Sequence, residues 1–124
     1  MILAMLATAL PEVVTGSSPW PFFTPWGVLV TTPLYGLHAI VLLTIIVRLR
    51  ALTWPALLFG GALFGLYEAY ITKVLFDPHF APEMALKFFG VAWHHVIMLV
   101  LWWHPLVAFI IPILLAETFM TSSR

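Results

Sequence analysis

The stretch PALLFGGALFGLYEAYITKVLF, residues 55–76, decides the fold of this chain. Its 22 residues would extend about 33 Å as one helix, enough to cross the roughly 30 Å hydrocarbon core of a bilayer. A Thr-Trp-Pro sequence at 53–55 is typical of a helix start, and an Asp-Pro pair at 77–78 is typical of a stop. We therefore expect a membrane-spanning helix over residues 54–76, with one carboxylate, Glu68, inside it.

Composition places the whole chain among membrane proteins. Of its 124 residues, 63% are hydrophobic and 8% are charged, whereas soluble domains carry about 25% charged residues. The length accommodates a few spans in a single domain over residues 1–124, so we predict an all-α helical bundle surrounded by the lipid bilayer. The five basic and five acidic residues cancel and include no basic run, so nucleic acid is not an expected partner. Cysteine is absent, which excludes disulfides and thiolate metal sites.

The first part of the chain is predicted to stay near the membrane surface. Residues 1–10 are apolar but too short to span, and we interpret them as a short helix at the interface or against the bundle. The alternative is a signal peptide, because Ala-Thr-Ala at 7–9 imitates a cleavage site. Residues 11–27 mix Pro, Gly, Ser and Thr with Trp and Phe, which predicts an interfacial loop anchored by aromatic rings.

Two further apolar runs predict the other spans. The first covers residues 28–50 and begins at Val28 or Thr32, with Pro33 at the first helical position in the latter case. The last covers residues 88–119 and would measure roughly 48 Å as one helix, so it is kinked or split at its central proline, Pro105. We favour three spans, with four as the alternative, in a multi-pass protein of the cell membrane. Three spans place the arginines of the chain on one side, which would be the cytoplasmic one.

One face of the second span carries small residues. Gly61, Gly65, Glu68 and Thr72 fall within about 60° of one another on a helical wheel, and Ala69 extends this face. A Gly-x-x-x-Gly spacing lets two membrane helices approach closely. We expect this face to pack on another helix of this chain or of a partner, with Glu68 directed at that helix.

Polar residues of the three spans form a candidate site. Measured from the predicted helix starts, His38, Glu68, His94 and His95 lie at similar depth, whereas His104 lies about 15 Å deeper than His94. A zinc or iron site could use His38, Glu68 and His94, and a haem could be held by His38 with His94 or His95. The alternative is a purely structural role, in which Glu68 accepts hydrogen bonds that hold helices together. The sequence leaves the cofactor open.

Three segments of the chain carry a family resemblance. They are PEVVTGSSPWPFFTP at 11–25, FGLYEAYITKVLF at 64–76 and WHHVIMLVLWWHPLVAFIIPILLAE at 93–117. Together they resemble uncharacterised polytopic membrane proteins of bacteria and archaea, in which a Gly-Ser-Thr/Ser-Pro loop and a Tyr-Glu span precede His-bearing spans. This resemblance implies a membrane bundle and brings no activity with it.

A looser similarity is to the CAAX-type intramembrane proteases, which use a Glu-Glu-x-x-x-Arg helix and later histidines. The matching stretch is EAYITK at 68–73, with alanine in place of the second Glu and lysine in place of Arg. The resemblance implies that Glu68 is a general base and that His94 or His95 helps to hold an oxyanion. Such proteases usually have more spans than this chain offers.

Two classes of function follow. The first is a small non-catalytic subunit or scaffold of a membrane complex, in which the polar residues serve helix packing or contact a lipid or cofactor. Its partners would be other membrane subunits or further copies of the chain. The second is a membrane-embedded hydrolase or metal-dependent enzyme centred on Glu68 with His94 and His95.

Overall fold

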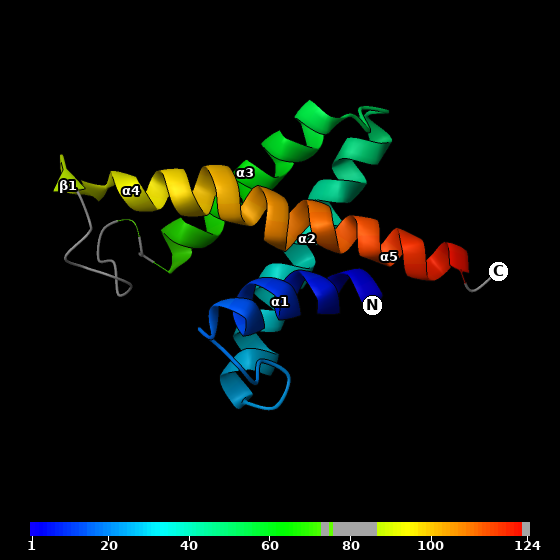
Figure 1. The fold of residues 1–124 in the computed structure, drawn as a ribbon, viewed down its shortest axis with the longest axis horizontal. Coiled ribbons are helices and arrows are strands. Elements are labelled where there is room, and N and C mark those ends of the chain that lie inside the picture. The colour runs from blue at the N-terminus through cyan, green and yellow to red at the C-terminus, as the bar shows by residue number, and fades with distance from the viewer. Residues whose placement is uncertain (73–74, 76–86, 123–124) are drawn as a thin grey trace.

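The computed structural model describes residues 1–72, 75 and 87–122, and these are largely helical (Figure 1). A first helix is followed by three longer ones, and the last and longest of these runs across the others in Figure 1. In chain order the helical elements are α1 (Ile2–Thr15), η1 (Gly27–Thr31), α2 (Thr32–Arg48), α3 (Trp54–Ile71), α4 (Trp93–His95), η3 (Val96–Ile110) and α5 (Ile111–Ser122). The two strands β1 (Lys87–Phe88) and β2 (Val91–Ala92) pair as an antiparallel hairpin before α4.

The helix α1 continues beyond residue 10, where we expected it to end. Pro11 lies inside it, and the helix ends at Gly16, whose φ of 73° lies in the left-handed region that glycine adopts readily. Its small residues allow it to pack closely on α2, because a Cβ added to Gly36 would lie 2.7 Å from the Cβ of Ala4. Ala7 is fully buried in the same core. The segment therefore forms part of the bundle.

The second helix also starts earlier than the sequence suggested. The hydroxyl oxygen of Thr24 accepts a hydrogen bond from the N–H of Gly27 at 3.0 Å, as an N-cap residue does. Thr24 is followed by proline, as Thr32 is, and the chain uses the earlier of these two equivalent start signals. Pro33 therefore lies inside a continuous helix, where it cannot donate to the Leu29 carbonyl, and the turn before it, η1, is π-helical.

The helix α3 begins where it was predicted and ends earlier. Thr53 caps it, since its hydroxyl accepts from the N–H of Ala56 at 3.4 Å. The helix ends at Ile71 rather than Phe76, and the hydroxyl of Thr72 turns back to the carbonyl oxygen of Glu68 at 3.0 Å. The predicted end of this span and the polar loop after it lie largely outside the described residues.

The last apolar run is one helix and is not split at Pro105. It covers Trp93–Ser122, 30 residues, and its central part, η3, is π-helical, which accommodates the proline within the helix. It also starts five residues later than the predicted Phe88. The hairpin occupies those residues, and its turn has Phe89 and Gly90 at φ values of 53° and 74°, as tight hairpin turns require.

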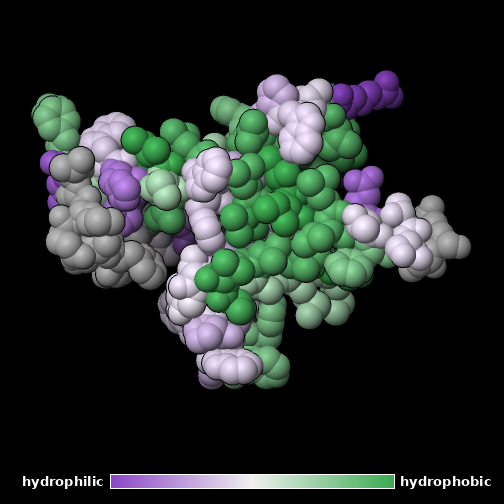
Figure 2. Space-filling view, viewed as in Figure 1, coloured by the Kyte–Doolittle hydropathy of each residue, from purple (hydrophilic) through white to green (hydrophobic). Residues whose placement is uncertain are grey.

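Two helices in the described part of the chain are long and apolar enough to cross a membrane. They are Gly27–Arg48, with 22 residues, and Trp93–Ser122. Hydrophobic residues cover most of the face seen in Figure 2. Large apolar side chains such as Leu29 and Phe59 are exposed on the helices, which is unusual for a protein in water and favourable in lipid.

Candidate functional site

The closest helix contact in the bundle is between α3 and η3. A Cβ added to Gly61 would collide with the Cα of Pro105, and one added to Gly65 would lie 2.8 Å from the Cβ of His104 and 3.1 Å from the Cα of Val100. Ala69, one turn beyond Gly65, is fully buried. The small residues therefore bring the backbone of α3 against η3, and this approach places Glu68 beside η3.

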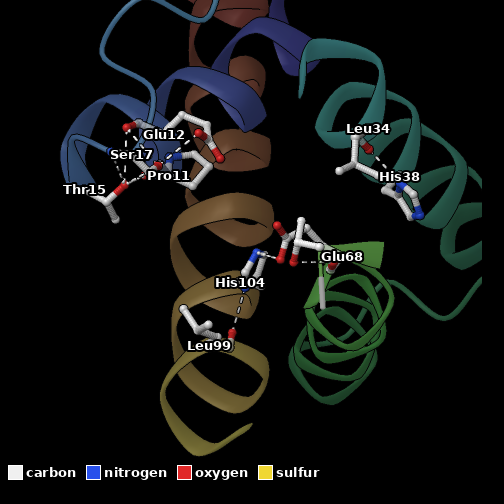
Figure 3. A network of polar contacts seen from close by, with 10 residues as sticks. Pro11, Glu12, Thr15, Ser17, Leu34, His38, Glu68, Leu99 and His104 are labelled. Atoms are coloured by element: carbon white, nitrogen blue, oxygen red, sulfur yellow. Dashed lines mark hydrogen bonds and ion pairs between the residues drawn. The ribbon is translucent and has the colours of Figure 1, made fainter. Parts of the chain in front are cut away.

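Glu68 and His104 form a buried pair at this contact (Figure 3). The Nε2 atom of His104 lies 3.3 Å from Oε2 of Glu68, and the two residues are 2% and 8% exposed. The other ring nitrogen, Nδ1, lies 2.8 Å from the carbonyl oxygen of Leu99. Because a carbonyl can only accept, Nδ1 carries a proton and donates it, and Nε2 faces Glu68.

The contact between the two side chains is an ion-pair contact rather than a well-aligned hydrogen bond. Within the described residues, Nε2 of His104 is buried and makes no hydrogen bond, although Glu68 lies within ion-pair distance. Aromatic rings hold the imidazole in this position. Tyr35 stacks on it at a centroid distance of 6.1 Å, and Phe64 meets it edge-on at 5.5 Å. The pair is thus fixed in place by packing, with Nε2 of His104 directed at Glu68.

The partner of Glu68 differs from the one expected from the sequence. We predicted that His94 and His95 share the depth of Glu68 and that His104 lies apart. Because the last helix starts later than predicted, His94 and His95 lie in its first turn. They are therefore about 7 Å nearer to the N-terminal end of this helix than we predicted. The imidazole of His104 reaches Glu68 instead.

His38 belongs to a different part of the surface. Its Nδ1 donates to the carbonyl oxygen of Leu34 at 2.6 Å, and its ring stacks on Phe64 at 5.4 Å. It lines a shallow apolar groove of about 330 Å³ between α2 and α3, together with Tyr67. The proposed metal set of His38, Glu68 and a histidine of the last helix is therefore not brought together. Across residues 1–72, 75 and 87–122, no group of three or more acidic or imidazole side chains is arranged to hold a metal ion.

A cavity of about 610 Å³ lies beside the Glu68–His104 pair. It is lined by residues of α1, η1, α2, the end of α3 and the last helix, and most of its wall is apolar. Its polar and titratable lining residues are Glu12, Thr15, Ser17, Thr31, Tyr35, Glu68, Thr72, His94, His95 and His104. The cavity thus unites Glu68 with both histidines that we predicted and with His104.

Glu12 is the second carboxylate of this cavity, and sequence reasoning did not single it out. The hydroxyl of Ser17 donates to its Oε2 at 3.0 Å, and the hydroxyl oxygen of Thr15 lies 2.8 Å from that of Ser17 (Figure 3). Tyr35 lines the cavity with both carboxylates, and its ring stacks on that of His104. Tyr35 therefore belongs both to the cavity wall and to the surroundings of the buried pair. A signal in the sequence could have identified Glu12. It is the helical spacing of small and polar residues along α1, namely Ala4, Thr8, Pro11, Glu12 and Thr15.

Among the described residues that line the cavity there is no Lys or Arg. Its titratable groups are two carboxylates, three imidazoles and one phenol. A carboxylate paired with an imidazole can accept and return a proton, so the site has the components for acid–base chemistry as well as for binding a polar group.

Comparison with known proteins adds the family. A family model described as an uncharacterized membrane protein family matches residues 1–124. The chain belongs to this family. An uncharacterized protein of Archaeoglobus fulgidus is 45% identical over 124 residues, which cover 100% of this chain and 39% of that relative. The chain thus spans well under half the length of the relative. No solved structure matches the chain.

Family membership confirms that the chain is a membrane protein. It also confirms the resemblance to uncharacterised prokaryotic membrane proteins. The similarity to CAAX-type proteases stays a prediction. The family description assigns no reaction or ligand, so the function has to be argued from the cavity.

Proposed function

We propose that the chain is a non-catalytic, multi-pass membrane module that binds an amphipathic, lipid-like molecule in the cavity between α1, α2, α3 and the last helix. Three helices would cross the bilayer, namely the continuous helix ending in α2, then α3, and then the helix Trp93–Ser122. The helix α1 would close one side of the cavity without spanning.

One observation carries this proposal: the cavity combines a largely apolar wall with several polar and titratable side chains. Its volume of about 610 Å³ lies within the roughly 300–1,000 Å³ typical of small-molecule sites. Val30, Leu34 and Met98 supply apolar wall, whereas Glu68 and His104 supply the buried polar groups. Such a division suits a ligand with an alkyl part and a polar head, because each part then meets a matching surface.

The exposed apolar surface outside the cavity supports a role as one part of a larger assembly. Partner subunits or further copies of this chain would cover that surface. In this proposal the small residues Gly61, Gly65 and Ala69 serve packing within the chain, Thr72 lines the cavity instead, and the partners contact other faces.

A second candidate, a membrane-embedded hydrolase, is favoured by the Glu68–His104 pair. The fixed Nδ1 proton of His104 would orient the imidazole, and Glu68 would activate water as a general base. His94 and His95 line the same cavity and could contact a substrate. The binding proposal is preferred because the pair has the apolar surroundings of a lipid site.

Native mass spectrometry of the chain released from lipid micelles tests the binding proposal. We expect wild-type protein to retain lipid-like molecules, and Val30→Trp, which fills the cavity, to lose them. Leu29→Trp is the matched control, because the neighbouring side chain is 75% exposed and points away from the cavity. Equal retention by the two variants would contradict the proposal. Turnover of a lipid ester that is lost in Glu68→Gln would favour the hydrolase instead.

A further inference from the structure

We propose that the cavity selects a ligand with a cationic amine headgroup, held between Glu12 and Glu68. This inference rests on the proposed binding function and adds the chemical class of the ligand. It depends on the charges of the cavity, on the partners of the two carboxylates and on the aromatic rings beside them.

The Glu12 carboxylate lacks a basic partner among the described residues. The hydrogen bond that its side chain accepts there comes from a neutral group, the hydroxyl of Ser17. The ion pair that the described part of the cavity contains is the one between Glu68 and His104. Glu12 is half-buried beside a largely apolar wall, and a ligand amine would supply the opposite charge that its carboxylate lacks there.

Glu68 can take part in the same site because its pairing with His104 is adjustable. Nε2 of His104 is buried without a hydrogen bond in the described structure, 3.3 Å from Oε2 of Glu68 and out of alignment with it. A carboxylate oxygen can accept more than one hydrogen bond, so Glu68 can also accept from a ligand amine. Tyr35 lines the cavity together with Glu12 and Glu68, so an ammonium group bound beside its ring would face a wall that carries both carboxylates.

Aromatic faces complete a cation site. Tyr35, Trp26 and Trp103 line the cavity, and the faces of Trp and Tyr rings attract ammonium groups. An anionic head would instead meet two carboxylates, which like-charge repulsion opposes. The apolar wall then takes the alkyl chain, as the binding proposal requires.

Competition among amphiphiles with the same alkyl chain tests the inference. The full chain in dodecyl maltoside micelles is titrated with dodecyltrimethylammonium, with the uncharged dodecyl tetraethylene glycol ether and with dodecyl sulfate, and binding is followed by tryptophan fluorescence and native mass. We expect the cationic probe to bind at least about tenfold more tightly than the uncharged one. Lysophosphatidylethanolamine distinguishes a lipid amine headgroup from a free long-chain amine, because its phosphate adds a negative charge.

The variants Glu12→Gln and Glu68→Gln should each lower the preference for the cationic probe by about tenfold, whereas the near-isosteric amides leave the fold intact. Glu117→Gln is the matched control, since Glu117 lies on α5 outside the cavity and is exposed. Equal binding of cationic and uncharged probes, both blocked by Val30→Trp, would overturn the cationic head and leave the binding function standing. Failure of every probe to bind would overturn both.

Discussion

Substituting alanine for Gly65 adds one methyl group at the contact between α3 and η3. Its Cβ would lie 2.8 Å from the Cβ of His104, about 0.6 Å inside the 3.4 Å at which such contacts become ordinary. The two helices must therefore separate, because the Cα of Val100 is also only 3.1 Å away and is backbone. Overpacking of this kind costs about 1–3 kcal/mol. The shift also draws Glu68 away from His104.

The sign of the change in unfolding free energy distinguishes a tight contact at Gly65 from an open position. At an open helix position alanine is more favourable than glycine by about 0.5–1 kcal/mol, so an unpacked Gly65 would give stabilisation. The assay is unfolding by sodium dodecyl sulfate in mixed micelles, followed by tryptophan fluorescence. Leu66→Ala is the control, since Leu66 is 49% exposed and a change there should stay within about 0.5 kcal/mol. A Gly65→Ala protein as stable as wild type or more stable would refute the close approach of the two helices.

Three further outcomes follow from the same contacts. His104→Ala leaves the Glu68 carboxyl buried without its partner and should cost about 1–3 kcal/mol in the same unfolding assay, whereas His104→Asn should recover part of that loss. Phe64→Ala opens a void beside the imidazole and should cost about 3 kcal/mol, with ligand binding measured in parallel to show the loosened site. His38→Gln should leave amphiphile binding unchanged, because His38 lines the other groove; a loss of binding in this variant would contradict the assignment of the site to the larger cavity.

Local signals in the sequence were sufficient for some elements. The start of α3 was predicted from Thr53 and the Trp-Pro that follows, and it is confirmed by the cap hydrogen bond to Ala56. Caps depend on neighbouring residues alone, so they are visible without the rest of the fold. Where two identical signals compete, as Thr24-Pro25 and Thr32-Pro33 do, the sequence does not rank them, and the surrounding packing decides.

The candidate site depended on long-range geometry that local signals do not contain. Glu68 was predicted to face a neighbouring helix, but its partner depends on how far α3 and the last helix slide along each other. The hairpin formed by β1 and β2 delays the start of that helix, and this brings His104 rather than His94 to Glu68. Glu12 was treated as part of a loop because Pro11 precedes it. The helix α1 continues through that proline and carries Glu12 to the cavity.

The most direct test of the account is nitrogen-15 magnetic resonance of the imidazole rings in lipid. The chain has five histidines, and His104→Asn identifies the signals of His104. We expect Nδ1 of His104 to carry a proton, and its Nε2 signal to shift in Glu68→Gln and when the cationic amphiphile is added, but not in Glu117→Gln. If the Nε2 signal of His104 shifts in neither case, Glu68 and His104 are not paired at the cavity. That result would contradict the account.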